Sequence, residues 1–208
     1  MLARVYRSEP IVYESVLCEY EAPFDENGVL YHIATAGRTR EWTNPHVSGE
    51  VVAAMSSEAD PLFPPDRFVV HRVEDCQGEY PGNNCTDNHE PNSWMSVDLG
   101  EGRSLVPRHY CLRHGRADPL YVGHTNPALV LRTWRLQGSQ DRQEWHTLRL
   151  HENDQSLAAA ASSVAGWAVE AGGREYRHFR VLQHGKNSSG FDFLVCCGIE
   201  LYGELFLE

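Results

Sequence analysis

The sequence predicts an all-β fold, a sandwich or a barrel, because short runs of β-type residues recur along the chain with turn-forming clusters between them. These runs span residues 29–34, 50–57, 67–72, 94–100, 108–115, 129–139, 144–151, 166–170, 176–185 and 194–203. The chain also holds 17 Gly and 11 Pro, which suits a fold with many tight turns. Only residues 154–165 have a composition that permits a helix, and their alanine run is equally typical of a loop.

The clearest strand pair lies within residues 132–157, which read RTWRLQGSQDRQEWHTLRLHENDQSL. Large side chains alternate with polar ones before the Gly/Ser/Asp cluster at 138–141, and the alternation resumes at Trp145. Such period-two patterning on both sides of a turn predicts a β-hairpin. We expect the two tryptophans, Trp134 and Trp145, to be core and corner residues rather than platforms for a ligand.

Residues 1–28 are acidic and poorly periodic, and we interpret them as an N-terminal arm that packs on the body or reaches a partner. Residues 29–208 are then the sandwich itself. Long connections cover 35–49, 57–66, 74–93 and 115–128. Loops of this length inside a compact β domain are usually functional or disordered, and 115–128 is the one we expect to be peculiar to this protein.

The charge balance narrows the class of ligand. With 29 Asp and Glu against 18 Lys and Arg, the 208-residue chain carries a formal net charge of −11, which disfavours nucleic acid as a partner. Neither a signal peptide nor an apolar run of membrane-spanning length is present. The six cysteines form no CxxC pair, and we interpret them as reduced thiols of an intracellular, cytoplasmic protein.

The order of the motifs carries a family resemblance. NSWMSVDLG is followed by a basic strand that ends in LRHG, then by LRTWRLQGSQDRQEWHTL, YRHFRVLQHG and a closing GIELYG. This series resembles a discoidin-like (coagulation-factor C-type) domain. With FDENGVLYHIATAGRTREWTNPHVSGEVVAAMSS ahead of it, the chain is similar to the version found in very large ubiquitin ligases and in proteins with BTB domains. The resemblance covers residues 24–204 and implies a jelly-roll β-sandwich of the galactose-binding-like type.

In such a sandwich one strand would be anchored in the core by Trp94, Val97 and Leu99. Its neighbour would contribute Trp134 and Leu136, and burial of aromatics of this size stabilises a core by several kcal/mol at about 25 cal/mol per Å². Trp145 would close the hairpin.

Reacting groups are hard to find in this sequence. It has no GxSxG elbow and no recognisable nucleophilic cysteine, so we predict that the domain is not an enzyme. Cys76, Cys85 and His89, with His71 as a fourth ligand, are candidate zinc ligands, and residues 87–90 and 152–154 are candidates for a structural calcium. Neither spacing is specific, and we predict no cofactor.

Three groups of residues are candidates for ligand binding. Strand ends supply His71 and Arg72, Arg113 and His114, and His184, Lys186 and Asn187; together they would form a basic rim for a carboxylate or an acidic peptide. The alternative is that the arginines hold the acidic loops of the sandwich itself. A sugar rim is the other reading, built from Trp42 with Asn44 and His46, or from Tyr121 with His124 and Asn126.

The sequence thus predicts a non-catalytic recognition module that binds a protein or peptide through loops at one end of a β-sandwich, serving a ubiquitin-ligase-like or BTB-type scaffold. Two alternatives stay open. The first is a lectin-like domain that binds a carbohydrate, a small molecule or a lipid headgroup. The second is a structural component of a large assembly.

Overall fold

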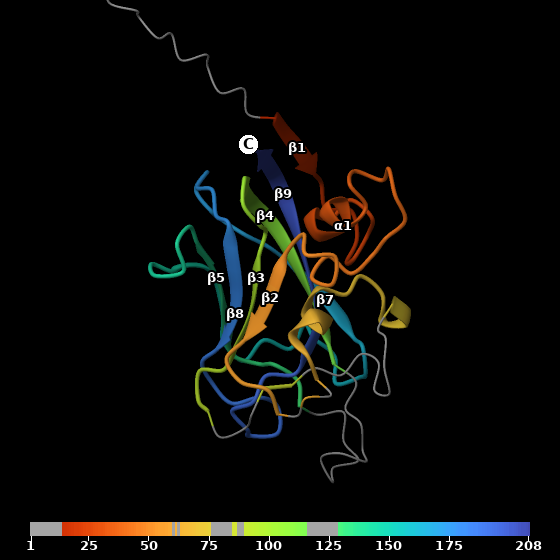
Figure 1. The fold of residues 1–208 in the computed structure, drawn as a ribbon. Helices are drawn as coiled ribbons and strands as arrows, with labels where there is room; N and C mark the ends of the chain where they lie inside the picture. Colours follow the sequence, from red (N-terminus) through yellow and green to blue (C-terminus); the bar gives the residue numbers. More distant parts are fainter. Residues whose placement is uncertain (1–13, 60, 62, 76–84, 87–89, 116–128) are drawn as a thin grey trace, which may run out of the picture.

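Two antiparallel sheets make up the protein in the computed structural model, which describes residues 14–59, 61, 63–75, 85–86, 90–115 and 129–208 (Figure 1). The elements are β1 Glu14–Cys18, α1 Val29–Ala34, β2 Val52–Met55, η1 Pro65–Val69, η2 Val73–Asp75, β3 Trp94–Asp98, β4 Arg103–His114, β5 Trp134–Ser139, β6 His146–His151, β7 Val164–Ala168, β8 His178–Gln183 and β9 Cys196–Leu207. The prediction of an all-β sandwich is confirmed.

One sheet has four strands in the order β1-β9-β4-β7, and the other has five in the order β2-β3-β8-β5-β6. Their facing sides form one core, which includes Phe68, Tyr110, Trp134 and Phe179, each with no exposed surface. The predicted hairpin is confirmed, because β5 pairs with β6 across the turn at 140–145. None of the helices in the described ranges is long and apolar enough to cross a membrane.

Two predicted strands are helices. Residues 29–34 form α1, whose buried residues Val29, Leu30 and Ile33 recur at helical spacing, so the run that suggested a strand is the apolar face of a short helix. Residues 67–72 begin inside the 3₁₀ helix η1, where a proline stands in the first turn and Phe68 enters the core. Residues 154–165 contain no regular helix, so the loop alternative holds there.

The register of β3 corrects a second expectation. Met95, Val97 and Leu99 point into the core with at most 1% of their surface exposed, whereas Trp94 is half-buried on the opposite face. Both faces of this strand carry a large apolar residue, so alternation alone did not decide which face is buried. Trp134 and Leu136 lie in the core as expected, and Trp145 is half-buried next to the hairpin turn.

Residues 14–28, which we had interpreted as part of an arm, pack on the body. β1 pairs with β9 along its whole length, from Glu14 opposite Leu207 to Cys18 opposite Gly203. β1 is the outer strand of the four-stranded sheet, and α1 lies next to it (Figure 1).

Candidate functional site

The predicted basic rim is not an exposed cluster. Arg113 is 6% exposed, and its guanidinium donates to the backbone oxygens of Val70 (3.2 Å) and His71 (2.6 Å) while it lies 4.0 Å from the ring centroid of Phe24. His71 and His114 are also buried, with 5% and 1% exposure. These three side chains are covered in the fold, and a ligand-binding role for them stays a prediction. Arg113 instead ties the η1 segment to β4.

The other members of the rim are held locally. Arg72 is exposed and pairs with Glu26 at 3.2 Å, and Lys186 is exposed and pairs with the carboxylate of Asp192. Asn187 is 5% exposed, and its side chain binds the backbone of residues 189, 191 and 193 to close a turn. His184 is half-buried. These contacts favour the alternative in which the end-of-strand cations stabilise the loops of the protein itself.

In the candidate sugar rim at Trp42, the side chains of Asn44 and His46 bind backbone groups and support the loop. The Asn44 side chain donates to the backbone oxygen of Asp66 (3.0 Å) and accepts from the backbone nitrogen of His46 (3.0 Å). His46 in turn accepts from the backbone nitrogen of Ala53. Trp42 is half-buried beside this loop. The second sugar candidates, residues 121, 124 and 126, lie outside the described residues.

The metal candidates are only partly described. Cys76, His89 and residues 87–88 lie outside the described ranges, so the zinc set and one of the two calcium sets stay predictions. In the other calcium candidate, the Asp154 carboxylate is occupied by His151 (2.6 Å) and by the backbone nitrogen of Ser156 (2.7 Å). The described residues contain no cluster of three or more His, Cys, Asp or Glu with the geometry of a metal site.

An Asp–His–Tyr chain resembles a catalytic arrangement, but its tyrosine and histidine are buried in the core. Asp154 contacts Nδ1 of His151, Nε2 of His151 contacts the Tyr110 hydroxyl (2.7 Å), and the Trp134 indole donates to that hydroxyl (2.9 Å). Because the hydroxyl accepts from the indole, its own proton goes to Nε2, and Nδ1 carries the proton that Asp154 accepts. Tyr110 has no exposed surface and the His151 side chain has 1%, so this network stabilises the core.

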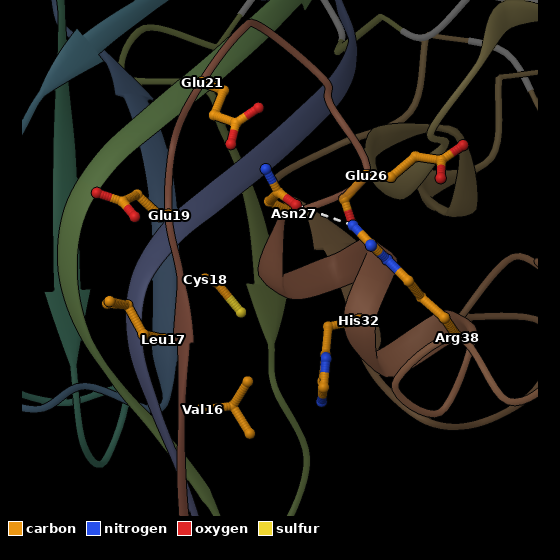
Figure 2. A pocket seen from close by; sticks show the side chains of 9 residues that line it. All are labelled: Val16, Leu17, Cys18, Glu19, Glu21, Glu26, Asn27, His32 and Arg38. Atoms are coloured by element: carbon orange, nitrogen blue, oxygen red, sulfur yellow. Dashed lines mark hydrogen bonds between the residues drawn. The ribbon is translucent and has the colours of Figure 1, made fainter.

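A groove of about 290 Å³ separates β1 from α1 (Figure 2). Figure 2 shows Val16 and Cys18 on the side of β1 that faces the helix, while Leu17 and Glu19 point to the other side. The opposite wall carries His32 of α1 and, after it, Arg38, which donates to the Asn27 side chain at 2.8 Å. The lining residues are Val16, Leu17, Cys18, Glu19, Glu21, Glu26, Asn27, His32 and Arg38.

The helical wall of the groove is fixed from below by Glu200 of β9. This carboxylate is 1% exposed and accepts the backbone N–H groups of Leu30 (2.8 Å) and Tyr31 (3.2 Å) in the first turn of α1, and that of Leu201 (2.9 Å). Burial is the main cause that raises the pKa of Glu200 to about 8. The carboxyl thus acts as the N-terminal cap of a helix 170 residues away in the chain. Gly28 is required beside it, because an added Cβ would lie 2.1 Å from the Glu200 side chain.

The rim of the groove is acidic, and β1 offers a strand edge. Glu19 and Glu21 are exposed. Leu17, which lies on β1, has 55% of its surface exposed. Within the described part of the chain β1 pairs only with β9, so its second edge presents unpaired backbone groups. The groove therefore combines backbone hydrogen-bonding groups and the apolar side chains of β1 with acidic residues at the rim and Arg38 on the opposite wall. Sequence reasoning missed it because β1 was not recognised as a strand.

A second depression, of about 390 Å³, lies where the β5–β6 turn meets the segment before β8. Tyr176, which is 3% exposed, belongs to its lining. The other lining residues are polar: Gln140, Asp141, Glu144, His146, Arg174 and Glu175. Gln140 donates to the backbone oxygen of Glu175 (2.7 Å) and so joins the two segments.

Solved structures share this architecture. The lectin domain of lectinolysin complexed with Lewis B antigen superposes with a TM-score of 0.51 at 18% identity, covering 73% of this chain and 91% of that domain. A carbohydrate-binding module, CBM32-3, from a family 31 glycoside hydrolase of Clostridium perfringens gives 0.50 at 12% identity, over 75% and 92%. At these identities the likeness defines the fold, which is that of a galactose-binding-like β-sandwich.

Sequence relatives define the type of domain more closely. The chain is 34% identical over 194 residues to the E3 ubiquitin-protein ligase hecd-1 of Caenorhabditis elegans and 34% identical over 187 residues to the E3 ubiquitin-protein ligase Ufd4 of Drosophila melanogaster. It is 28% identical over 190 residues to a BTB/POZ domain-containing protein of Arabidopsis thaliana. These matches cover 92%, 88% and 89% of the chain but 7%, 6% and 22% of the relatives. No family model matches the chain. The chain is a discoidin-like domain of the type found in large ubiquitin ligases and BTB-domain proteins.

Proposed function

We propose that this domain is a non-catalytic recognition module that binds an extended segment of another protein along β1. The observation that carries the proposal is the edge of β1 beside the groove under α1. An extended peptide that adds to a sheet edge gains backbone hydrogen bonds, and its alternate side chains enter a neighbouring pocket. Here the side chains on one side of the peptide would contact Val16 and the helical wall, and those on the other side would contact Leu17.

The charge of the rim specifies the ligand further. Glu19 and Glu21 form no ion pair with any of the described residues, whereas Glu26 is paired with Arg72. These two unneutralised carboxylates, Glu21 at the end of the groove and Glu19 on the other side of β1, favour lysine or arginine in the bound segment, because opposite charges steer association and fix register. The ligand we propose is therefore an extended basic segment. The basic rim predicted from the sequence would instead bind an acidic peptide.

The setting of the module is part of the proposal. Similarity to two E3 ubiquitin-protein ligases supports a role in presenting a substrate or a scaffold to such a ligase, inside the cell. The described cysteines are free thiols, which supports a reducing compartment, and burial raises the pKa of Cys18, Cys111 and Cys196 to about 12, so these three thiols stay protonated.

A peptide-binding assay tests the proposal directly. The probe is a fluorescein-labelled ten-residue peptide in which lysine and valine alternate, measured by fluorescence polarisation with the full chain. The double variant Glu19→Lys/Glu21→Lys is expected to bind about tenfold more weakly, since each exposed charge contact contributes up to roughly 1 kcal/mol. Glu152→Lys/Glu170→Lys makes the same charge change at exposed positions away from the groove and should bind like wild type.

Hydrogen exchange supplies the second readout. The bound peptide should slow exchange of the β1 amides, because strand addition pairs backbone groups that otherwise face water. Unchanged exchange in residues 14–18, or equal weakening by both double variants, would refute binding along β1.

A saccharide ligand is the second candidate function, and the depression around Tyr176 favours it. Polar side chains such as those of Gln140, Glu144 and Arg174 can bind sugar hydroxyls, and the buried Tyr176 ring forms only the floor of the depression. The test is binding to a panel of immobilised saccharides, with Arg174→Ala as the variant expected to lose binding. Retention of no saccharide by the wild-type chain would remove this candidate.

A further inference from the structure

The outward face of the five-stranded sheet carries large apolar side chains, which are unusual on a sheet face that contacts only water. In the register of the sheet Trp94 lies opposite Leu182, Leu182 opposite Arg135, and Arg135 opposite Leu150. Leu150 is 46% exposed, and Val52 on the edge strand β2 is 51% exposed. The row that runs Trp94, Leu182, Arg135 and Leu150 across four strands is called the outer row below. Antiparallel sheets usually place polar residues on a face that meets only water.

The next row on the same face is organised around an arginine. The Arg180 guanidinium lies 4.1 Å from the ring centroid of Trp145 and donates to the Gln137 side chain at 2.8 Å. The Gln137 side chain in turn donates a hydrogen bond to the Thr147 hydroxyl at 3.3 Å. Because stacking and hydrogen bonding hold it, Arg180 is already ordered and would lose little side-chain entropy on binding a carboxylate.

Positive charge on this face is not neutralised by its own strands. The five strands contain a single carboxylate, Asp98, and Arg177 binds it at 2.6 and 3.0 Å. Among the described side chains, neither Arg135 nor Arg180 has an ion-pair partner. This face is therefore locally basic and apolar, although the whole chain has a net charge of −11.

We propose that this face is a second interaction surface and that it binds a partner protein whose contact surface places aspartate or glutamate between apolar side chains. Tryptophan and arginine are the residues that most often dominate binding energy at protein interfaces. The outer row supplies the apolar contact, and Arg135 and Arg180 supply charges that select carboxylates. The surface lies on the sheet opposite β1, so one domain would contact two partners of opposite charge.

The probe is a twelve-residue peptide in which aspartate and leucine alternate, carrying a benzophenone for photo-crosslinking. With the full chain, Arg135→Glu is expected to weaken binding about tenfold or more, since it converts an attraction into a repulsion. Leu150→Ser, its cross-strand neighbour, should weaken binding about threefold through lost apolar contact. Arg108→Glu gives the same charge change at an exposed position on β4 of the other sheet and should have no effect. Crosslinks should map to β3, β5, β6 and β8.

Crossed measurements separate this inference from the proposed function. Glu19→Lys/Glu21→Lys should leave the acidic peptide unaffected, and Arg135→Glu should leave the lysine–valine peptide unaffected. Equal loss with Arg135→Glu and Arg108→Glu would overturn the proposal, as would crosslinks confined to other elements. Sedimentation that shows a dimer dissociated by Leu150→Ser, without binding of the acidic peptide, would assign the face to a second copy of the chain and would also overturn it.

Discussion

Stability should fall between pH 5 and pH 7 because of one buried carboxyl group, that of Glu200. Burial raises its pKa from 4.5 to about 8 in the folded protein, while three backbone N–H donors act in the opposite direction. The folded state therefore keeps a proton that the unfolded state releases. For a group whose pKa is raised on folding, the stabilising contribution is complete below about pH 4.5 and is lost as the pH rises to about 8.

The magnitude follows from the proton count. Across pH 5 to 7 folded Glu200 is mainly protonated and unfolded Glu200 is mainly ionised, so the states differ by nearly one proton. Linkage then gives about 1.4 kcal/mol per pH unit, or about 2.7 kcal/mol over this range.

Urea unfolding of wild type and Glu200→Gln at pH 5, 6 and 7 isolates this contribution, because every other titrating group is common to both proteins. Glutamine retains the oxygen that accepts from Leu30 and Leu201, but its amide nitrogen faces the N–H of Tyr31. The variant is therefore expected to start less stable at pH 5 and to gain about 2.7 kcal/mol on wild type by pH 7. A difference that stays constant with pH would mean that Glu200 is ionised in the fold and that its three donors outweigh desolvation.

Three further predictions concern the core. Tyr110→Phe removes the hydroxyl shared by Trp134 and His151 and should destabilise the protein by about 2–4 kcal/mol in urea unfolding, so an unchanged midpoint would contradict the network. Burial lowers the pKa of His151 below 6.5, so its contribution is present above that pH and is lost as the pH falls; an NMR titration with a midpoint above 6.5 would contradict this. Gly138→Ala would place a Cβ 2.7 Å from the Tyr176 ring and should cost about 1–3 kcal/mol, measured as a lower Tm than that of the wild-type protein; an unchanged Tm would contradict this close contact.

Local patterns predicted the elements that depend on neighbours in the chain. The β5–β6 hairpin is one, because its turn residues and both alternating strands are contiguous. Helix α1 is the contrary case: its six residues read as a strand, and its first turn is capped by Glu200, which no local pattern indicates. η1 was missed because Phe68 and its neighbours are apolar in any conformation, so only the fold of the surrounding segment decides.

The two candidate surfaces depend on strand order, which the sequence does not display. The groove exists because β1 pairs with β9, almost the whole chain away. The outer row exists because β8 lies between β3 and β5, which brings Leu182 next to Trp94 and Arg135. Residues such as Arg113 looked like ligand-binding groups because a charged residue at a strand end is usually exposed, and here a loop covers it.

The position of β9 sets the order in which the domain can assemble during synthesis. β9 is the last strand along the described chain, yet it lies between β1 and β4 and supplies their register. A nascent chain that has emerged only as far as β8 lacks the strand that joins β1 to β4 and lacks Glu200, which holds α1. The four-stranded sheet, and the groove with it, can therefore form only after residue 207 has left the ribosome, and until then the edges of β1 and β4 lack the strand that pairs with both.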